Sequence, residues 1–283
     1  MRTSYRSEDV ILLLKDITGL VTPLPAAERE KYIQSGTHYC EMLPLEYTPA
    51  PSYLEAYEQA LVTQADAVAA AVRRTADLLY DIHQENLVLV SLARAGIPIG
   101  ILLRWQLQRK YGINVPHYAI SIIRGRGIDH NAMRYLLSRY APEQLRFVDG
   151  WTGKGAIYRE LQKELSVYPG VSPDLAVLSD PANLTPLCGT HMDLLIPSSC
   201  LNCTVSGLIS RTFLRKDIIG QNDFHGAAYY GQLAAEDRSY SFLRAIAARL
   251  STAPDLPEIE LTGTGLAEAK QIALHFGISD INF

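Results

Sequence analysis

Three loops of this 283-residue sequence carry residue types that bind phosphate groups. SLARAGIPIG holds Arg94 between small residues, and IIRGRGIDH holds Arg124 and Arg126 beside glycines. RFVDGWTGKG places Asp149 ahead of a loop of glycines, a threonine and a lysine. Backbone N–H groups of a glycine loop and the N-terminus of a following helix suit a phosphate, and arginines add positive charge. An acid beside them suits sugar hydroxyls or a magnesium ion, so the loops predict a phosphorylated sugar as the ligand.

The third loop differs from the common nucleotide-binding motifs. If Gly153 and Lys154 took the Gly-Lys positions of a P-loop, the first glycine of that motif would fall on Val148. The serine or threonine that follows the lysine would fall on Gly155, and the sequence contains no GxGxxG pattern. These mismatches exclude a P-loop and leave a dinucleotide site without support.

The composition is that of a soluble globular protein. Hydrophobic residues make up 48% of the chain and charged residues 20%. No apolar run reaches the length of about 18 residues that predicts a membrane span, and the N-terminal segment lacks the cleavage site of a secretory signal. The cysteines are Cys40, Cys188, Cys200 and Cys203. They do not suggest a disulfide framework in a chain of this size, which favours a reduced, cytoplasmic setting.

The charge is distributed unevenly. The net charge of −4 gives no overall attraction to nucleic acid, but residues 94–163 hold twelve Lys and Arg against four Asp and Glu. A basic central segment in an acidic protein suits a small polyanionic ligand.

Hydrophobic periodicity predicts the elements that position these loops. Residues 53–84 have the pattern of one long amphipathic helix. Apolar strands then alternate with helical segments, the strands being NLVLVSLA, PHYAISII, QLRFVD, PDLAVLSD and HMDLLIPSS. This alternation predicts an α/β fold with a twisted, mainly parallel sheet, helices on both faces, and extensions at both ends. The LARAG and GWTGKG loops would then lie at the carboxyl edge of the sheet, where such folds bind ligands.

Three parts can be distinguished along the chain. Residues 1–50 form an N-terminal extension, and residues 51–250 form the α/β core. In residues 251–283, IELTG, GLAEAKQIALHFG and ISDINF have the patterns of a strand, a helix and the start of another strand. We expect this last part to be the start of a small α/β domain that is incomplete where the sequence ends.

The three loops, in this order, resemble those of the type I phosphoribosyltransferases over about residues 53–182. The resemblance implies a pyrophosphate loop at LARAG, a ribose 5-phosphate loop at VDGWTGKG and a mobile loop at RGRG. It assigns catalytic roles to Asp149, Arg94, Arg124 and Arg126. It assigns phosphate and ribose contacts to Ala93, Ala95, Gly96, Gly150, Thr152, Gly153, Lys154 and Gly155. The implied ligand is phosphoribosyl pyrophosphate or a related ribose phosphate with Mg²⁺, which Asp149 would contact indirectly.

Two features depart from the usual motif of that family. Gly150 stands where a second acid is usual, and only two residues separate Asp149 from Thr152. The variant motif, GTHYCEMLPLEY and SGLISRTFL resemble a subgroup encoded with tellurite-resistance and stress-response genes, some members of which are labelled the cysteine protease StiP family. Members of this subgroup often continue into a Pelota-like RNA-binding domain, which would explain the end of the sequence at Phe283.

The segment around the last three cysteines allows several interpretations. Cys188 and His191 form one pair with zinc-like spacing, and a second pair follows in SCLNC, although a strand between the pairs leaves little slack to join them. For a peptidase, Cys203 ahead of a helix would be the nucleophile and His225 its base. Asp223 or Asn222 would orient that base. By analogy alone, a polar set would bind the acceptor: Asn202, Ser206, Ser210, Arg211 and His225.

Two further residues carry simpler expectations. His38 in GTHYCE either reaches the site or, as we expect, has a structural role, and Trp151 either caps the ligand pocket or anchors its loop to the core.

The sequence therefore predicts an enzyme that transfers a phosphoribosyl group to an unidentified acceptor. Two alternatives stay open: a cysteine peptidase that uses Cys203 and His225, and a non-catalytic ribose-phosphate or nucleotide sensor or RNA-associated protein. The predicted partners are a phosphorylated sugar or nucleotide-like ligand, and RNA through a further C-terminal domain. No association with a membrane is expected. A homodimer is an option, because mobile loops in the phosphoribosyltransferases often serve a neighbouring subunit.

Overall fold

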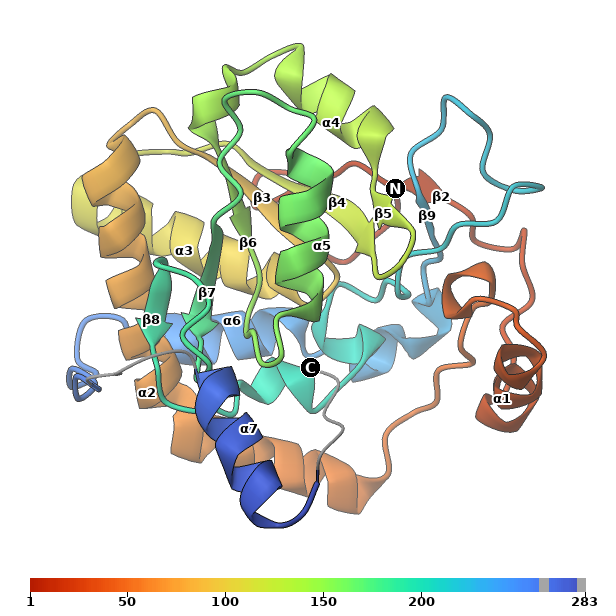
Figure 1. The fold of residues 1–283 in the computed structure, drawn as a ribbon. Coiled ribbons are helices and arrows are strands. Elements are labelled where there is room, and N and C mark those ends of the chain that lie inside the picture. The colour runs from red at the N-terminus through yellow and green to blue at the C-terminus, as the bar shows by residue number, and fades with distance from the viewer. Residues whose placement is uncertain (260–264, 279–283) are drawn as a thin grey trace.

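A mostly parallel sheet forms the centre of the computed structural model, which describes residues 1–259 and 265–278 (Figure 1). Its strands are β1 (Ile11–Leu12), β3 (Val88–Ala93), β4 (His117–Ile123), β5 (Gly127–Ile128), β6 (Leu145–Val148), β7 (Leu175–Ser179) and β8 (Cys188–Thr190). Their order is β1-β4-β3-β6-β7-β8, and all of these pairs are parallel. Strand β5 pairs antiparallel with β4, while β2 (Lys15–Asp16) and β9 (Gly226–Ala227) form a separate parallel pair.

Helices cover both faces of the sheet, which confirms the predicted α/β fold. The α-helices are α1 (Ala26–Gln34), α2 (Pro51–His83), α3 (Gly96–Tyr111), α4 (His130–Leu137), α5 (Ala156–Leu165), α6 (Ser239–Ala247) and α7 (Gly265–His275). Short 3-10 helices are η1 (Tyr39–Glu41), η2 (Pro142–Gln144), η3 (Pro197–Ser199), η4 (Cys203–Val205) and η5 (Gly231–Glu236). Helices α2, α3 and α6 pack against one face, and α4 and α5 pack against the other (Figure 1).

The central strands are mostly apolar because both of their faces are buried, and the polar side chains within them, such as His117 in β4 and Arg146 in β6, are buried as well. In β3, Leu89 packs in the cluster of α2, α3 and α6, whereas Val88 and Val90 pack in the cluster of α4 and α5. Successive side chains of a strand point to opposite faces, so a continuous apolar run serves two cores at once. Helix α3 ends where Gly112 takes a left-handed conformation with φ of 72°.

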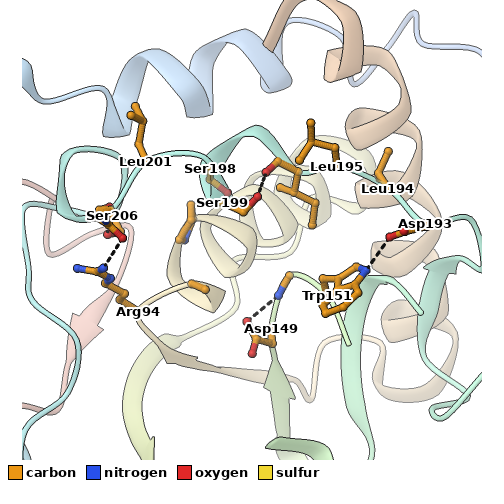
Figure 2. A pocket seen from close by; sticks show the side chains of 15 residues that line it. Arg94, Asp149, Trp151, Asp193, Leu194, Leu195, Ser198, Ser199, Leu201 and Ser206 are labelled. Carbon is orange, nitrogen blue, oxygen red and sulfur yellow. Dashed lines mark hydrogen bonds between the residues drawn. The ribbon is translucent and has the colours of Figure 1, made fainter. Parts of the chain in front are cut away.

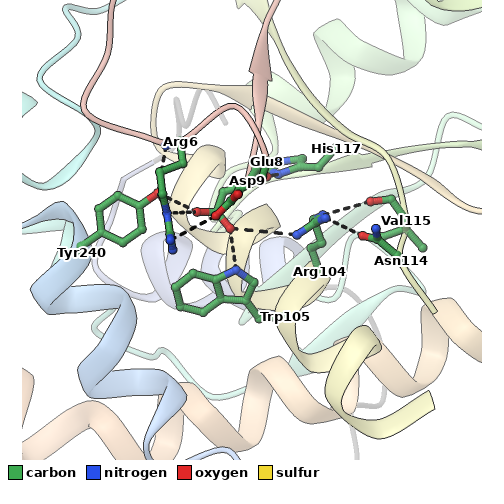
Figure 3. Close-up of polar contacts among 9 residues, drawn as sticks. All are labelled: Arg6, Glu8, Asp9, Arg104, Trp105, Asn114, Val115, His117 and Tyr240. Atoms are coloured by element: carbon green, nitrogen blue, oxygen red, sulfur yellow. Dashed lines mark hydrogen bonds and ion pairs between the residues drawn. The ribbon is translucent and has the colours of Figure 1, made fainter. Parts of the chain in front are cut away.

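The first 50 residues are tied into the core. Strand β1 extends the central sheet beside β4, and Asp9 lies buried between the N-terminal segment, α3 and α6 (Figure 3). One carboxylate oxygen of Asp9 accepts a hydrogen bond from Trp105 Nε1 at 2.7 Å, and the other accepts one from the Tyr240 hydroxyl at 2.6 Å. The boundary at residue 50 stays a prediction, but this segment contributes a strand to the sheet.

The strand predicted at residues 191–199 is wrong. HMDLLIPSS forms no strand; β8 precedes it at Cys188–Thr190, and Pro197 begins η3 instead. Proline lacks the N–H that a sheet requires, and Leu195 is exposed, so this apolar run does not behave as a buried strand.

The predicted helix near the C-terminus corresponds to α7, whereas most of the two strands expected around it lies outside the described residues. Within the described ranges, no helix is both long enough and apolar enough to cross a membrane.

Candidate functional site

A cavity of about 600 Å³ lies at the carboxyl ends of β3 and β6 (Figure 2). The loop after β3, the loop after β6, and the segment between β8 and η4 form its walls. The lining residues are Arg94, Ala95, Pro98, Asp149, Gly150, Trp151, Asp193, Leu194, Leu195, Ile196, Ser198, Ser199, Leu201, Asn202 and Ser206. Its walls are mainly apolar with a few convergent polar groups, as is usual for a ligand pocket.

Asp149 places an unusual carboxyl group in this cavity. The residue keeps some exposed surface on the cavity, but protein surrounds its carboxyl group closely, and this burial raises its pKa to about 7. The backbone N–H of Gly150 donates to Oδ1 at 2.8 Å and partly opposes the shift. A carboxyl group with such a pKa can exchange a proton near neutral pH.

Arg94 lines the cavity but is held by protein partners. Its Nη1 pairs with a Glu46 carboxylate oxygen at 3.1 Å and also donates to the Ile209 carbonyl at 3.1 Å. Its Nη2 donates to Asn202 Oδ1 at 3.0 Å. The guanidinium therefore fixes two cavity walls relative to each other.

The GWTGKG loop is packed by its own tryptophan. A Cβ added at Gly153 would lie 2.1 Å from the Trp151 ring, so the indole covers that glycine. Trp151 Nε1 donates to Asp193 at 3.3 Å across the cavity rim (Figure 2). Arg159 donates to the carbonyl of Lys154 at 2.7 Å. Trp151 therefore lines the cavity and covers its own loop, but it is about half exposed and does not anchor that loop to the core.

The structure brings together only part of the predicted phosphate and ribose site. Of the residues assigned to that site, Arg94, Ala95, Asp149 and Gly150 line the cavity, as do Asn202 and Ser206 of the predicted acceptor set. Those that do not line it are Ala93, Gly96, Thr152, Gly153, Lys154 and Gly155. Gly96 instead lets α3 approach β6, since a Cβ there would lie 2.5 Å from the Val148 carbonyl oxygen.

Arg124 and Arg126 lie on a tight hairpin between β4 and β5. Arg126 pairs with Glu41 at 2.8 Å, and the Gly125 N–H donates to Glu160 at 3.0 Å, so this RGRG turn is fastened to η1 and α5. The cavity lining includes neither arginine. Their expected place beside Asp149 is therefore not seen in this arrangement.

Cys203 and His225 each contact other groups, and no hydrogen bond between them is found. Cys203 is buried in a cluster with Tyr230 and others, and burial raises the pKa of its thiol to about 12. His225 is also buried, and its ring Nδ1 contacts Ser121 Oγ at 2.9 Å. The backbone N–H of His225 donates to the Asp129 carboxylate at 2.6 Å. Cys203 lies in η4, a single short 3-10 turn, so the expected helix N-terminus beside it is missing.

The predicted acceptor set is only partly gathered at the cavity, because Ser210, Arg211 and His225 do not line it. Asn202 lines the cavity, whereas Arg211 lies over the Tyr39 ring, 5.8 Å from its centroid. Burial, followed by the nearby Arg29 and Arg94, lowers the pKa of Arg211, and its Nε is buried without a hydrogen-bond partner. Ser210 is bound within its own loop, through the Arg211 carbonyl and the Ala228 N–H.

A thiol–imidazole pair that sequence analysis missed lies beside the RGRG turn. His38 Nδ1 is 3.0 Å from Cys40 Sγ, and the backbone N–H of Cys40 also points to that nitrogen at 3.4 Å. A backbone N–H only donates, so Nδ1 is the acceptor and the proton of the neutral ring lies on Nε2. Burial raises the pKa of the Cys40 thiol to about 11, and the positive charge of Arg126 opposes that shift. The only sequence signal was the close spacing in GTHYCE.

A second pair has a different geometry. Cys188 Sγ lies 3.6 Å from Nδ1 and 3.5 Å from Nε2 of His191, so the sulfur is about equally far from both ring nitrogens. His191 Nδ1 lies 2.9 Å from the carbonyl oxygen of Asp180, which can only accept and therefore fixes the ring proton on Nδ1. The other two cysteines, Cys200 and Cys203, form no part of this cluster, so the predicted four-residue zinc site is not assembled.

Comparison with known proteins gives one family. The model of a family described as tellurite-like stress resistance cysteine protease StiP matches residues 3–247. A relative from Acinetobacter baylyi (strain ATCC 33305 / BD413 / ADP1), named cysteine protease StiP, is 40% identical over 255 residues. That match covers 86% of this chain and 66% of the relative, so the chain spans slightly less than two thirds of the relative's length.

Among solved structures, two of a hypoxanthine-guanine phosphoribosyltransferase from Bacillus anthracis are similar to this chain. The first is 14% identical with a TM-score of 0.33, covering 44% of this chain and 76% of the other. The second, with a HEPES molecule in its active site, is 14% identical with a TM-score of 0.32 and covers 46% and 81%. Scores this low carry no argument about activity.

These comparisons contradict the main functional hypothesis from the sequence. The matched family and the curated relative are named for a cysteine protease, which corresponds to the alternative and not to phosphoribosyl transfer. The structure gives a physical reason for the error. Glycine-rich loops at the edge of a parallel sheet suggest a phosphate cradle, but here Trp151 covers Gly153 and the close approach of Gly96 to Val148 packs a helix onto a strand.

Proposed function

We propose a function from this premise: the chain belongs to the StiP family of tellurite-like stress resistance cysteine proteases. It is an enzyme that hydrolyses peptide bonds through a cysteine thiol and acts in a stress response. The four cysteines are free, which suits the reduced, cytoplasmic setting in which we place it. Dependence on magnesium, binding of RNA and formation of a homodimer stay predictions.

The pair of His38 and Cys40 is the proposed catalytic pair, and its 3.0 Å contact is the observation that carries the proposal. A nucleophile and its base must lie within hydrogen-bond reach, about 2.6–3.2 Å. The unprotonated Nδ1 of His38 faces the sulfur, so the imidazole is set to accept the thiol proton. The rival pairs lack this arrangement: the base assigned to Cys203 contacts Ser121, and the two nitrogens of the His191 ring are about equally far from the paired sulfur.

The reaction follows from that arrangement. His38 Nδ1 takes the proton from Cys40, and the thiolate attacks the carbonyl carbon of the peptide. The C–N bond breaks while the imidazolium returns the proton to the leaving amine, which leaves a thioester. Water then cleaves the thioester and restores the thiol. The guanidinium of Arg126 favours the thiolate, and the unpartnered N–H of Arg211 beside Tyr39 is a candidate donor to the carbonyl oxygen.

The described conformation is a resting state in this proposal. Cys40 has no exposed surface, and its sulfur lies 3.6 Å from the Leu214 carbonyl oxygen, so no peptide reaches it directly. Movement of η1 away from Leu214 would expose the sulfur with its base still attached, because both belong to the same short segment. A buried, protonated thiol also protects the enzyme from oxidation until it is needed.

The test measures cleavage of unfolded casein and of a peptide library by the full chain. Cys40→Ser removes the nucleophile and should abolish cleavage, and His38→Gln should lower kcat/KM by about 100-fold or more. Cys200→Ser changes a cysteine without a base and should retain full activity.

Each other outcome has a defined meaning. A folded Cys40→Ser protein that still cleaves peptides would refute the assignment of the nucleophile. If cleavage is lost in Cys203→Ser or Cys188→Ser instead, the peptidase function stands with a different thiol. A folded wild type that cleaves nothing, with or without mild destabilisation by urea to open the site, would refute the function itself.

A further inference from the structure

Three side chains with metal-binding atoms meet at the free edge of the central sheet, away from the His38–Cys40 pair. Asp180 follows β7, Cys188 begins β8, and His191 follows β8. One ligand atom from each lies within 4.8 Å of the other two, and this is the one such group of three or more among the residues that the structure describes. Asp180 and Cys188 are buried, while His191 is half-buried, so the cluster has one side toward solvent.

The carboxylate of Asp180 has one oxygen without a protein partner. Its Oδ2 accepts backbone hydrogen bonds from Leu184 at 2.6 Å and Thr185 at 2.9 Å, which fix the carboxylate in place. Its Oδ1 has no hydrogen-bond partner in the protein, and it cannot reach bulk solvent because the residue has no exposed surface. A buried carboxylate oxygen left unpaired is costly, so this atom points to a missing positively charged or donating group.

The histidine is arranged as metal-bound histidines usually are. Its Nδ1–H donates to the Asp180 carbonyl at 2.9 Å, which fixes the tautomer that leaves the Nε2 lone pair free. Cys188 Sγ lies 3.5 Å from Nε2. In a tetrahedral zinc site, a sulfur at about 2.3 Å and a nitrogen at about 2.0 Å from the metal are about 3.5 Å apart. A small rotation of the ring would aim Nε2 at an ion between the two atoms.

We propose that Asp180, Cys188 and His191 bind a zinc-like divalent transition-metal ion. Thiolate, imidazole and carboxylate are ligands that zinc and cobalt(II) share, whereas magnesium and calcium prefer oxygen alone. On binding, the Cys188 thiol releases its proton to solvent and the metal–sulfur bond takes its place. Water fills the fourth position on the half-buried side of His191. The ion joins the ends of β7 and β8 and closes the loop between them.

The test is a titration of the metal-free full chain with cobalt(II), followed by its absorption spectrum. The expected result is one cobalt per chain, with d–d bands of tetrahedral intensity and a near-ultraviolet band for charge transfer from thiolate. Cys188→Ser should lose the charge-transfer band, and His191→Gln should weaken binding by about tenfold or more. Zinc added to the cobalt protein should remove both sets of bands by displacement.

Two controls keep the result specific. Cys200→Ser, which changes a half-buried thiol outside the cluster, should leave the spectrum unchanged. Cys40→Ser should also leave it unchanged. A folded wild type that binds no cobalt, or a charge-transfer band that survives in Cys188→Ser and disappears in Cys40→Ser, would overturn the proposal. If Cys188→Ser does not fold, His191→Gln decides: unaltered cobalt affinity in that variant refutes the site. None of these readouts uses peptidase activity, so the two proposals fail separately.

Discussion

Replacing Asp149 with asparagine should change how the stability of the protein depends on pH. Burial raises the pKa of this carboxyl from 3.8 to about 7. In the unfolded chain the carboxyl group has its ordinary pKa of 3.8. At a pH between the unfolded and the folded pKa, the folded state therefore holds a proton that the unfolded state has lost. Stability is therefore unaffected by this group below about pH 4, falls as the pH rises, and levels off above about pH 7.

The size of the effect follows from the shift. A difference of about three pKa units corresponds to about 4 kcal/mol at 1.36 kcal/mol per unit. Asp149 faces a cavity that water can enter, which reduces the penalty of the charged form, so we expect about 2 to 4 kcal/mol. An asparagine side chain carries no charge, and its amide oxygen can accept the Gly150 N–H in the same way. The substitution therefore removes the pH dependence and keeps the contact.

The assay is urea unfolding of both proteins from about pH 4 to about pH 8, with the difference in unfolding free energy plotted against pH. As the pH rises, the unfolding free energy of the asparagine variant should increase relative to that of the wild type by about 2 to 4 kcal/mol. Asp193→Asn changes an exposed acid on the rim of the same cavity and should follow the wild type closely. If the difference between Asp149→Asn and the wild type stays flat across this range, the carboxyl group is not held in a desolvated site and the reasoning is wrong.

Two further substitutions test the packing that positions the site. Gly96→Ala would place a Cβ 2.5 Å from the Val148 carbonyl oxygen, and because backbone cannot swing away, unfolding in urea should show a loss of about 1–3 kcal/mol. Unaltered stability would mean that α3 is free to shift. Asp9→Ala would leave the half-buried donors of Trp105 and Tyr240 without their acceptor and should cost about 2–4 kcal/mol, whereas Glu8→Ala on the exposed neighbouring residue should cost almost nothing.

The sheet was predictable because its strands obey a simple rule. A parallel strand buried on both faces is mostly apolar, and so are the segments that became β3, β4, β6 and β7. The rule failed at HMDLLIPSS, where three apolar residues line a cavity and cover a loop without pairing in a sheet. Length and hydrophobicity alone do not distinguish these cases, since a loop can also bury apolar side chains.

The site was predictable only in position. Parallel topology brings the ends of β3 and β6 to one edge, so Arg94 and Asp149 were expected to meet there, and both line the cavity. Which atoms face the cavity depends on loop conformation, which no periodic pattern encodes. The ring of Trp151 folds over its own loop, and the side chain of His38 turns back to Cys40 within a single 3-10 turn.

The two thiol–imidazole pairs show why residue type alone does not determine chemistry. In each histidine, a backbone group determines whether Nδ1 accepts or donates a hydrogen bond. His38 Nδ1 faces a backbone N–H and therefore accepts, whereas His191 Nδ1 faces a backbone carbonyl and therefore donates. The first arrangement leaves a lone pair directed at a thiol, as proton transfer requires. The second leaves a lone pair on the far nitrogen, in a group that also holds a thiol and a buried carboxylate, as metal binding requires. Cysteine substitutions in the two pairs should therefore separate cleanly, with Cys40→Ser abolishing peptide cleavage without altering the cobalt spectrum. Loss of the cobalt–thiolate band in that variant would show that the two tautomers do not divide the chemistry in this way.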